Sequence, residues 1–111
     1  MKPITTLLTI IFITLLSFPS WSETKDDLVE RNDLYYKKFT DVPFTGKVTG
    51  QWNGKIKNGK QKGLWKTYFG NGQLWWKGIY IDGKKDGLWE SFKKDGSVEK
   101  TETYKDGELI E

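Results

Sequence analysis

The chain has 111 residues, of which 15% are aromatic and 30% charged, and it contains no cysteine and no histidine. These absences exclude disulfides, thiol nucleophiles, the commonest zinc ligands and the commonest general base. The formal net charge is +3, and every basic residue except Arg31 is a lysine. Because bidentate recognition of bases and phosphates favours arginine, this composition argues against nucleic acid as a partner.

Residues 1–22 have the three-part layout of a secretory signal peptide. A lysine near the start precedes an almost wholly apolar or threonine run from Ile4 to Phe18, and the small residues Ser20 and Ser22 stand at −3 and −1 of a predicted cut. A membrane anchor is the alternative, but a spanning helix needs about 20 apolar residues. We therefore expect cleavage before Glu23, followed by a periplasmic or secreted fate. Without cysteine, a lipoprotein anchor is excluded.

Residues 23–111 are predicted to form one small all-β domain, an antiparallel meander of hairpins. Asn-Gly and Asp-Gly dipeptides suit type I′ turns, because both central residues of such a turn need positive φ. They occur at 53–54, 58–59, 71–72, 82–83, 95–96 and 106–107, with Asn32-Asp33 as a weaker relative. Most intervals have room for one strand. Only Thr24 to Val29 has the pattern of a single helical turn, capped by Thr24.

An internal repeat of 24 residues is the main feature of this domain. Residues 63–86 align on 87–110, and a worn earlier copy covers about 39–62. We expect the following repeat positions to be structural: Gly63, Trp65, Tyr68, Gly72, Tyr80 and Gly83, with their counterparts Gly87, Trp89, Phe92, Gly96, Tyr104 and Gly107.

Turn positions also predict the strand register. If each turn is a two-residue loop, Trp65 lies opposite Gly78, Trp76 opposite Trp89, and Gly78 opposite Gly87. Glycine beside a large aromatic residue lets the ring lie flat over bare backbone. Three glycines are expected to make this room: Gly63, Gly78 and Gly87. The Asn53-Gly54 turn predicts a short or irregular hairpin, because the next turn follows so closely.

Charges are distributed unevenly along the chain. Residues 42–81 contain seven lysines and no acid, whereas 82–111 contain six lysines and nine acids. Residues 23–41 contain four basic residues and six acids. Lysines that merely keep a sheet surface soluble and lysines that contact an anionic partner both give this pattern, so it leaves both interpretations open.

Three tryptophans are not required by the repeat. Trp75 and Trp76 correspond to Glu99 and Lys100 in the next copy, and Trp52 lies outside the periodic set. Tryptophan near lysine is typical of contact residues for a partner protein or an anionic surface, although additional core packing is the alternative. The predicted partner-binding set is Trp52, Lys66, Trp75, Trp76 and Lys77.

The spaced motifs "GLWKTYFGNGQL…YIDGK" and "GLWESFKKDGSV…YKDGE" resemble the bacterial variant of the MORN repeat. The segment "LVERNDLYYKKFTDVPFTGKVTG", residues 28–50, is similar to the usual lead-in of such proteins, except that Asn32-Asp33 replaces an Asn-Gly or Asp-Gly turn. Proteins of this kind are often grouped with the YwqK-type antitoxins of toxin–antitoxin systems. The resemblance implies a single-layer β-hairpin array and a binding role, without one particular ligand.

Three functional interpretations follow. The preferred one is an exported, non-enzymatic module that binds a partner protein in the manner of an antitoxin or immunity protein. Because the chain carries an export signal, its target should lie outside the cytoplasm. The alternative is a module that binds an anionic lipid or glycan surface of the envelope. An enzyme is disfavoured: Glu90 and Glu99 are the carboxylate pair considered for glycoside hydrolysis, and no cofactor or metal is expected.

Overall fold

The computed structural model describes residues 22–111, so the predicted signal peptide lies outside the described residues except for Ser22. The described part is all-β, which confirms this part of the fold prediction, and its one helical element is the short 3-10 turn η2 (Lys25–Asp27). No helix in residues 22–111 is long and apolar enough to cross a membrane. The strands are β1 (Ser22–Thr24), β2 (Leu28–Arg31), β3 (Leu34–Lys37), β4 (Gly46–Thr49), β5 (Trp52–Lys57), β6 (Lys60–Tyr68), β7 (Leu74–Ile81), β8 (Lys84–Phe92), β9 (Val98–Lys105) and β10 (Glu108–Leu109).

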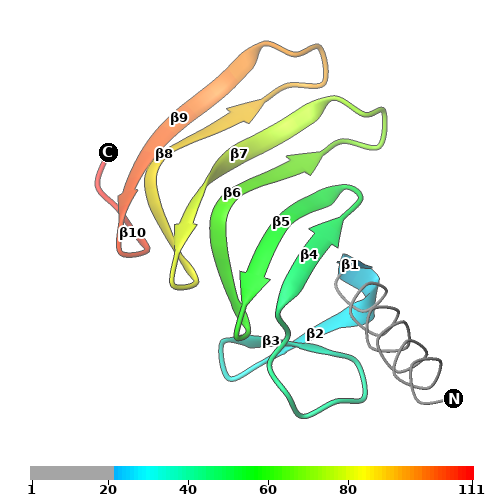
Figure 1. Cartoon of the computed structure of the whole chain (residues 1–111). Coiled ribbons are helices and arrows are strands. Elements are labelled where there is room, and N and C mark those ends of the chain that lie inside the picture. Colours follow the sequence, from blue (N-terminus) through cyan, green and yellow to red (C-terminus); the bar gives the residue numbers. More distant parts are fainter. Residues whose placement is uncertain (1–21) are drawn as a thin grey trace, which may run out of the picture.

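Eight strands form one sheet in the order β1-β4-β5-β6-β7-β8-β9-β10. From β4 onward every neighbour in the sheet is the next strand in sequence and is antiparallel, whereas β1 pairs in parallel with β4. The β2–β3 hairpin is a separate two-stranded sheet that crosses beneath the N-terminal end of the large one (Figure 1). The meander is therefore a single curved layer with a hairpin packed at one end.

Two kinds of turn alternate along the meander. At 32–33, 58–59, 82–83 and 106–107 a two-residue loop joins directly paired strand ends, and both of its residues have positive φ, as type I′ requires. At 71–72 and 95–96 the loop is one residue longer, so the prediction of a two-residue type I′ loop is wrong at these two positions. Phe69 and Gln73 pair through a backbone hydrogen bond, and Asn71 Oδ1 accepts a hydrogen bond from the backbone N–H of Gln73 at 2.9 Å. Gly72 supplies the single positive φ that this loop needs.

The dipeptide Asn53-Gly54 is not a turn, which corrects the sequence prediction. Both residues lie inside β5, and the chain reverses before them at Gly50, whose φ is +99°. The physical reason for the exception lies across the sheet: a Cβ on Gly54 would stand 2.2 Å from the indole of Trp65. This glycine is therefore required by packing and not by backbone conformation.

The predicted register holds next to some turns and fails at bulges. Trp65 lies opposite Gly78 as predicted. The 70–72 loop is one residue longer than the prediction assumed, but the extra residue Trp75 in a bulge of β7 restores the predicted pairing. The prediction that Trp76 pairs with Trp89, and Gly78 with Gly87, is wrong. Trp76 pairs with Ser91, because β8 carries two extra residues opposite Gly78. Bulges of this kind bend a strand and increase its twist.

The largest buried cluster lies at the N-terminal end, between the sheet and the β2–β3 hairpin. It consists of Leu28, Phe44, Val48, Ile56 and Trp65. Backbone hydrogen bonds fix the hairpin there, because Tyr35 donates to the carbonyl of Gly59 and Gly59 donates to that of Phe44, each at 2.8 Å. The type I′ turns also lie against one another, since Gly59 packs on Leu34 and Gly83 on Lys60. The β2–β3 hairpin, which is the lead-in hairpin of the sequence, thus covers the N-terminal end of the large sheet.

Candidate functional site

One face of the sheet, here called the aromatic face, carries a continuous row of aromatic rings. Neighbouring ring centroids are 5.4 Å apart for Tyr35 and Trp52, 4.6 Å for Trp52 and Trp65, and 6.1 Å for Trp65 and Tyr80. The row continues from Tyr80 to Trp89 at 5.0 Å. Tilted and edge-on contacts at these distances are the geometries that aromatic quadrupoles favour.

Two tryptophans in this row occupy equivalent positions 24 residues apart. Trp65 lies over Gly54 and donates its indole N–H to the Lys55 carbonyl at 3.1 Å. Trp89 lies over Gly78 and donates to the Ile79 carbonyl at 3.2 Å. Each indole is therefore buried flat against bare backbone with its polar group satisfied.

The prediction that Gly63 and Gly87 make room for rings is wrong. Nothing lies within 4 Å of a Cβ placed on either residue, and both have φ of +73°. Each one begins a bulge of two extra residues. In this bulge the tryptophan two positions later lies over the glycine of the neighbouring strand. They are needed for a backbone conformation that other residues rarely adopt.

Burial changes the acidity of tyrosines in the aromatic row. It raises the pKa of Tyr35 to about 12 and raises that of Tyr80. The Gln61 side chain hydrogen-bonds to Tyr80 and opposes the shift of the pKa there. One period later, Lys85 takes the place of Gln61, and its ammonium lies 4.7 Å from the Trp89 ring centroid and 4.9 Å from that of Tyr104.

A groove of about 290 Å³ opens on the aromatic face where the row ends. The residues that line it are Trp75, Trp76, Lys85, Trp89, Glu90, Ser91, Glu99, Lys100 and Glu102. Trp75 is 44% exposed and stacks on Phe69, with centroids 5.2 Å apart and planes 24° apart. Trp76 is partly buried against Trp89, at 5.2 Å. The groove therefore has one aromatic wall and one polar wall.

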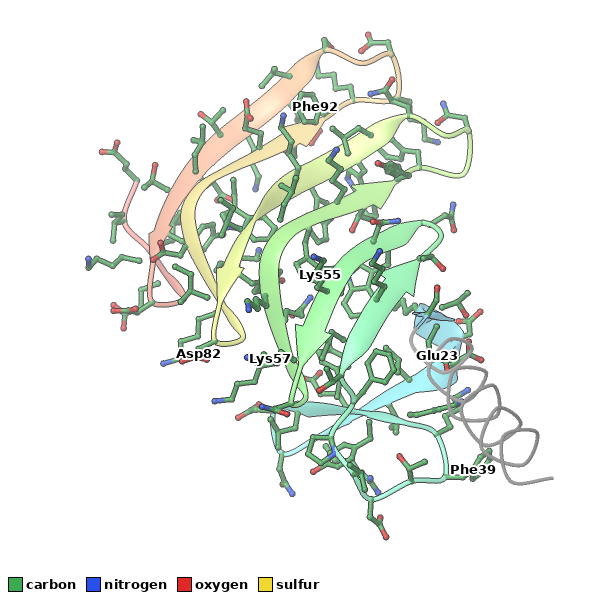
Figure 2. All side chains as sticks on the ribbon, in the orientation of Figure 1. Glu23, Phe39, Lys55, Lys57, Asp82 and Phe92 are labelled. Carbon is green, nitrogen blue, oxygen red and sulfur yellow. The ribbon has the colours of Figure 1, made fainter. Side chains whose placement is uncertain are left out.

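The opposite face, here called the lysine face, collects the whole basic centre of the sequence. Directly paired residues share a face, as do residues two apart on a strand. All seven lysines of the acid-free stretch therefore lie on one face. Their cross-strand pairs are Lys47–Lys55, Lys55–Lys62, Lys57–Lys60 and Lys66–Lys77. Lys55 and Lys57 project from β5 in Figure 2. Among the described residues, Lys77 alone of the seven forms an ion pair, with Glu90 at 4.0 Å.

The sheet divides the predicted partner-binding set between its two faces. Trp52, Trp75 and Trp76 contribute to the aromatic face, and only the last two line the groove. Lys66 and Lys77 lie opposite each other on the lysine face. Trp52 packs on Trp65 as Trp76 packs on Trp89. Trp52 therefore belongs to the periodic set, although the sequence prediction places it outside that set.

Sequence reasoning missed the grouping of the lysines, although a signal was present. Lys55 and Lys57, like Lys60 and Lys62, are two residues apart, which in a strand means one face. The β5–β6 turn at 58–59 then places both pairs on the same face. No group of three or more metal-ligating side chains occurs within residues 22–111.

No family model, no curated protein and no solved structure matches this chain. The resemblance to the MORN repeat therefore rests on the sequence motifs alone.

Proposed function

We propose that the chain is an exported, non-enzymatic MORN-like module that docks on an anionic lipid surface of the envelope through its lysine face. The observation that supports this is the segregation of seven lysines, with no acidic residue between Val42 and Ile81, onto one side of a thin sheet. A basic group close to an anionic membrane contributes about 1 kcal/mol of binding free energy.

Apolar side chains on the same face support a lipid surface. Leu64, Ile79 and Ile81 are 53%, 48% and 57% exposed and lie beside the lysines. The first two are direct cross-strand partners, and the third is two residues along the strand. Apolar groups of this kind enter the boundary between headgroups and acyl chains, while lysines keep their ammonium groups at the headgroups. MORN repeats in general have been linked to lipid binding, which agrees with this arrangement.

Co-sedimentation with vesicles tests the proposal. The chain from Ser22 onward, which contains every described strand, should bind vesicles that contain phosphatidylglycerol and should not bind pure phosphatidylcholine. The double variant K55E/K62E places two acids on the lysine face at directly paired positions. If each reversal removes at least about 1 kcal/mol, binding should fall at least about 30-fold.

The matched control is K93E/K94E, which changes the net charge by the same amount at the 93–96 turn. It should bind anionic vesicles within a few-fold of the unchanged chain. An equal loss in both double variants would show that net charge, and not the lysine face, governs binding. Equal binding to neutral vesicles would also contradict the proposal.

A protein partner, bound in the manner of an antitoxin or immunity protein, is the second candidate. The specific observation in its favour is the exposed Trp75, which stacks on Phe69 next to Trp76, since exposed tryptophans are common anchors of protein interfaces. It ranks second because the predicted contact residues do not form one surface. Affinity capture from envelope extracts tests it: one partner that is retained by the unchanged chain and lost by W75A/W76A would support it.

A further inference from the structure

The groove at the end of the aromatic row exists because the last repeat departs from the one before it. Trp75 and Trp76 lie at the bulge of β7, and the equivalent bulge in β9 carries Glu99, followed by Lys100. Trp65 is fully buried with Trp76 packed against its cluster, whereas Trp89 has Lys100 and Glu102 beyond it. Polar side chains therefore face an indole wall across an open space.

Each ring of the aromatic wall is packed on another aromatic ring. Trp75 is 44% exposed, yet its ring is almost parallel to Phe69 beneath it, with centroids 5.2 Å apart. Trp76 is likewise held against Trp89. A ligand that stacks here does not have to order these rings first, so little conformational entropy is lost.

The polar wall is balanced in charge. Glu102 accepts a hydrogen bond from the Tyr104 hydroxyl at 3.2 Å and lies 3.7 Å from the Lys100 ammonium. Glu99 adds a second carboxylate and Lys85 a second ammonium. The Glu90 carboxylate lies on the lysine face, where it pairs with Lys77 at 4.0 Å. Two acids thus face two ammonium groups, and both donors and acceptors are present.

This chemistry selects among ligand classes. An anion has a stronger site on the lysine face, and Lys85 already occupies the cation position over Trp89 and Tyr104. A sugar ring offers an apolar C–H face to an indole, and its hydroxyls both donate and accept, which suits carboxylates next to ammonium groups. A volume of about 290 Å³ is at the lower end for ligand pockets, so the groove has room for a small unit of a longer chain.

We propose that this groove binds a neutral saccharide unit of an oligosaccharide, with Trp75 as the stacking platform and Glu99, Lys100 and Glu102 as the hydroxyl-binding wall. The site is independent of the lysine face and lies on the other side of the sheet. Loss of vesicle binding in K55E/K62E would therefore leave saccharide binding unchanged.

The test is isothermal titration of the protein, purified after export, with uncharged tetrasaccharides: the β-1,4-linked N-acetylglucosamine tetramer and maltotetraose. At least one should bind with a dissociation constant in the millimolar range or tighter. W75A should weaken that binding at least tenfold, and E99Q should weaken it less. The matched control is I81A, which truncates another exposed apolar residue, on the lysine face, and should bind as the unchanged protein does.

Three results would overturn the proposal. One is the absence of binding by both tetrasaccharides at millimolar concentration. Another is equal binding by W75A and the unchanged protein. The third is an equal loss in I81A and W75A, which would indicate a general effect on the fold. Because Trp75 is exposed, W75A should retain the far-ultraviolet circular dichroism and melting temperature of the unchanged protein within a few degrees.

Discussion

The same arrangement occurs around Trp65 and around Trp89, and the two copies differ in what lies beyond them. Each indole covers a glycine on the preceding strand, and its N–H donates a hydrogen bond to the carbonyl of the residue after that glycine. Trp65 is 0% exposed, because the β2–β3 hairpin packs beneath its cluster, whereas Trp89 is 5% exposed and borders the groove. The two copies thus place the ring in the same way, and the neighbouring elements determine how completely it is buried.

Replacing the two tryptophans with alanine should give the largest losses of stability and tests this comparison most directly. Trp65→Ala should lower the free energy of unfolding by about 4 kcal/mol, and Trp89→Ala by about 3 kcal/mol, because the first cavity is wholly enclosed and the second can partly fill with water. Urea unfolding followed by circular dichroism measures both values. A larger loss for Trp89→Ala would contradict the view that the lead-in hairpin makes the first copy the more stable one.

Adding a methyl group to the glycine beneath each indole should have the next largest effect. A Cβ on Gly54 would be 2.2 Å from Trp65, and a Cβ on Gly78 would be 2.1 Å from Trp89. Gly54→Ala and Gly78→Ala should each destabilise the fold by about 3 kcal/mol, with Gly54→Ala the more severe, because its indole has no exposed side toward which to move. The melting temperatures of the two variants test this order.

The bulge glycines should respond to conformation alone. Gly63→Ala and Gly87→Ala meet no neighbouring atom but require φ of +73°, so each should cost about 1 kcal/mol. Asparagine tolerates this conformation better than alanine. Gly87→Asn should therefore recover part of the stability lost in Gly87→Ala, measured by thermal unfolding. No difference between the two variants would mean that space, and not φ, requires glycine here.

Two hydroxyls at equivalent positions should give a small stabilisation when removed. Thr67 Oγ1 and Ser91 Oγ are buried and have no hydrogen-bond partner among the described residues. Thr67→Val keeps the shape and removes the orphan group, so it should stabilise the fold by about 1 kcal/mol. Ser91→Ala should follow in the same direction. Destabilisation in both variants would show that ordered water satisfies these hydroxyls.

Alkaline pH should affect the lead-in end of the aromatic row. Burial raises the pKa of Tyr35 to about 12, whereas an unfolded tyrosine ionises near pH 10. The folded state therefore retains the proton longer, and the stability from this residue is complete below about pH 10 and declines as pH rises toward 12. Tyr35→Phe should flatten the decline of the melting temperature between these values. An unchanged slope would assign the alkaline sensitivity to another group.

Much of the fold could be predicted from residue types that have one dominant conformational role. Asn58-Gly59 and Asp82-Gly83 form the expected type I′ turns, and the strands between them alternate as expected. Asn53-Gly54 carries the same letters and is part of a strand, because the indole of Trp65 requires the glycine. A dipeptide does not reveal which of its two uses applies.

Less of the two candidate surfaces could be predicted. The sequence predicts Trp75 and Trp76 as contact residues because the next copy lacks them, and both line the groove. The same prediction includes Lys66 and Lys77 because they are near tryptophans in the sequence. Lys77 follows Trp76 directly, however, and its side chain lies on the opposite face together with that of its partner Lys66. The lysine face needed the actual pairing of β4, β5, β6 and β7, because the spacing within one strand does not show which face of the next strand it matches.

The sequence by itself determined the all-β class, the type I′ turns at 32–33, 58–59, 82–83 and 106–107, and the alternation of side chains along each strand, because these depend on positive φ at the turn residues and on a two-residue period. Only the tertiary structure decided where two extra residues bulge at Gly63 and Gly87, which glycine lies beneath which indole, and which side of the sheet collects the lysines. A bulge shifts the pairing by small steps, and its position depends on rings contributed by a neighbouring strand, which no local pattern contains.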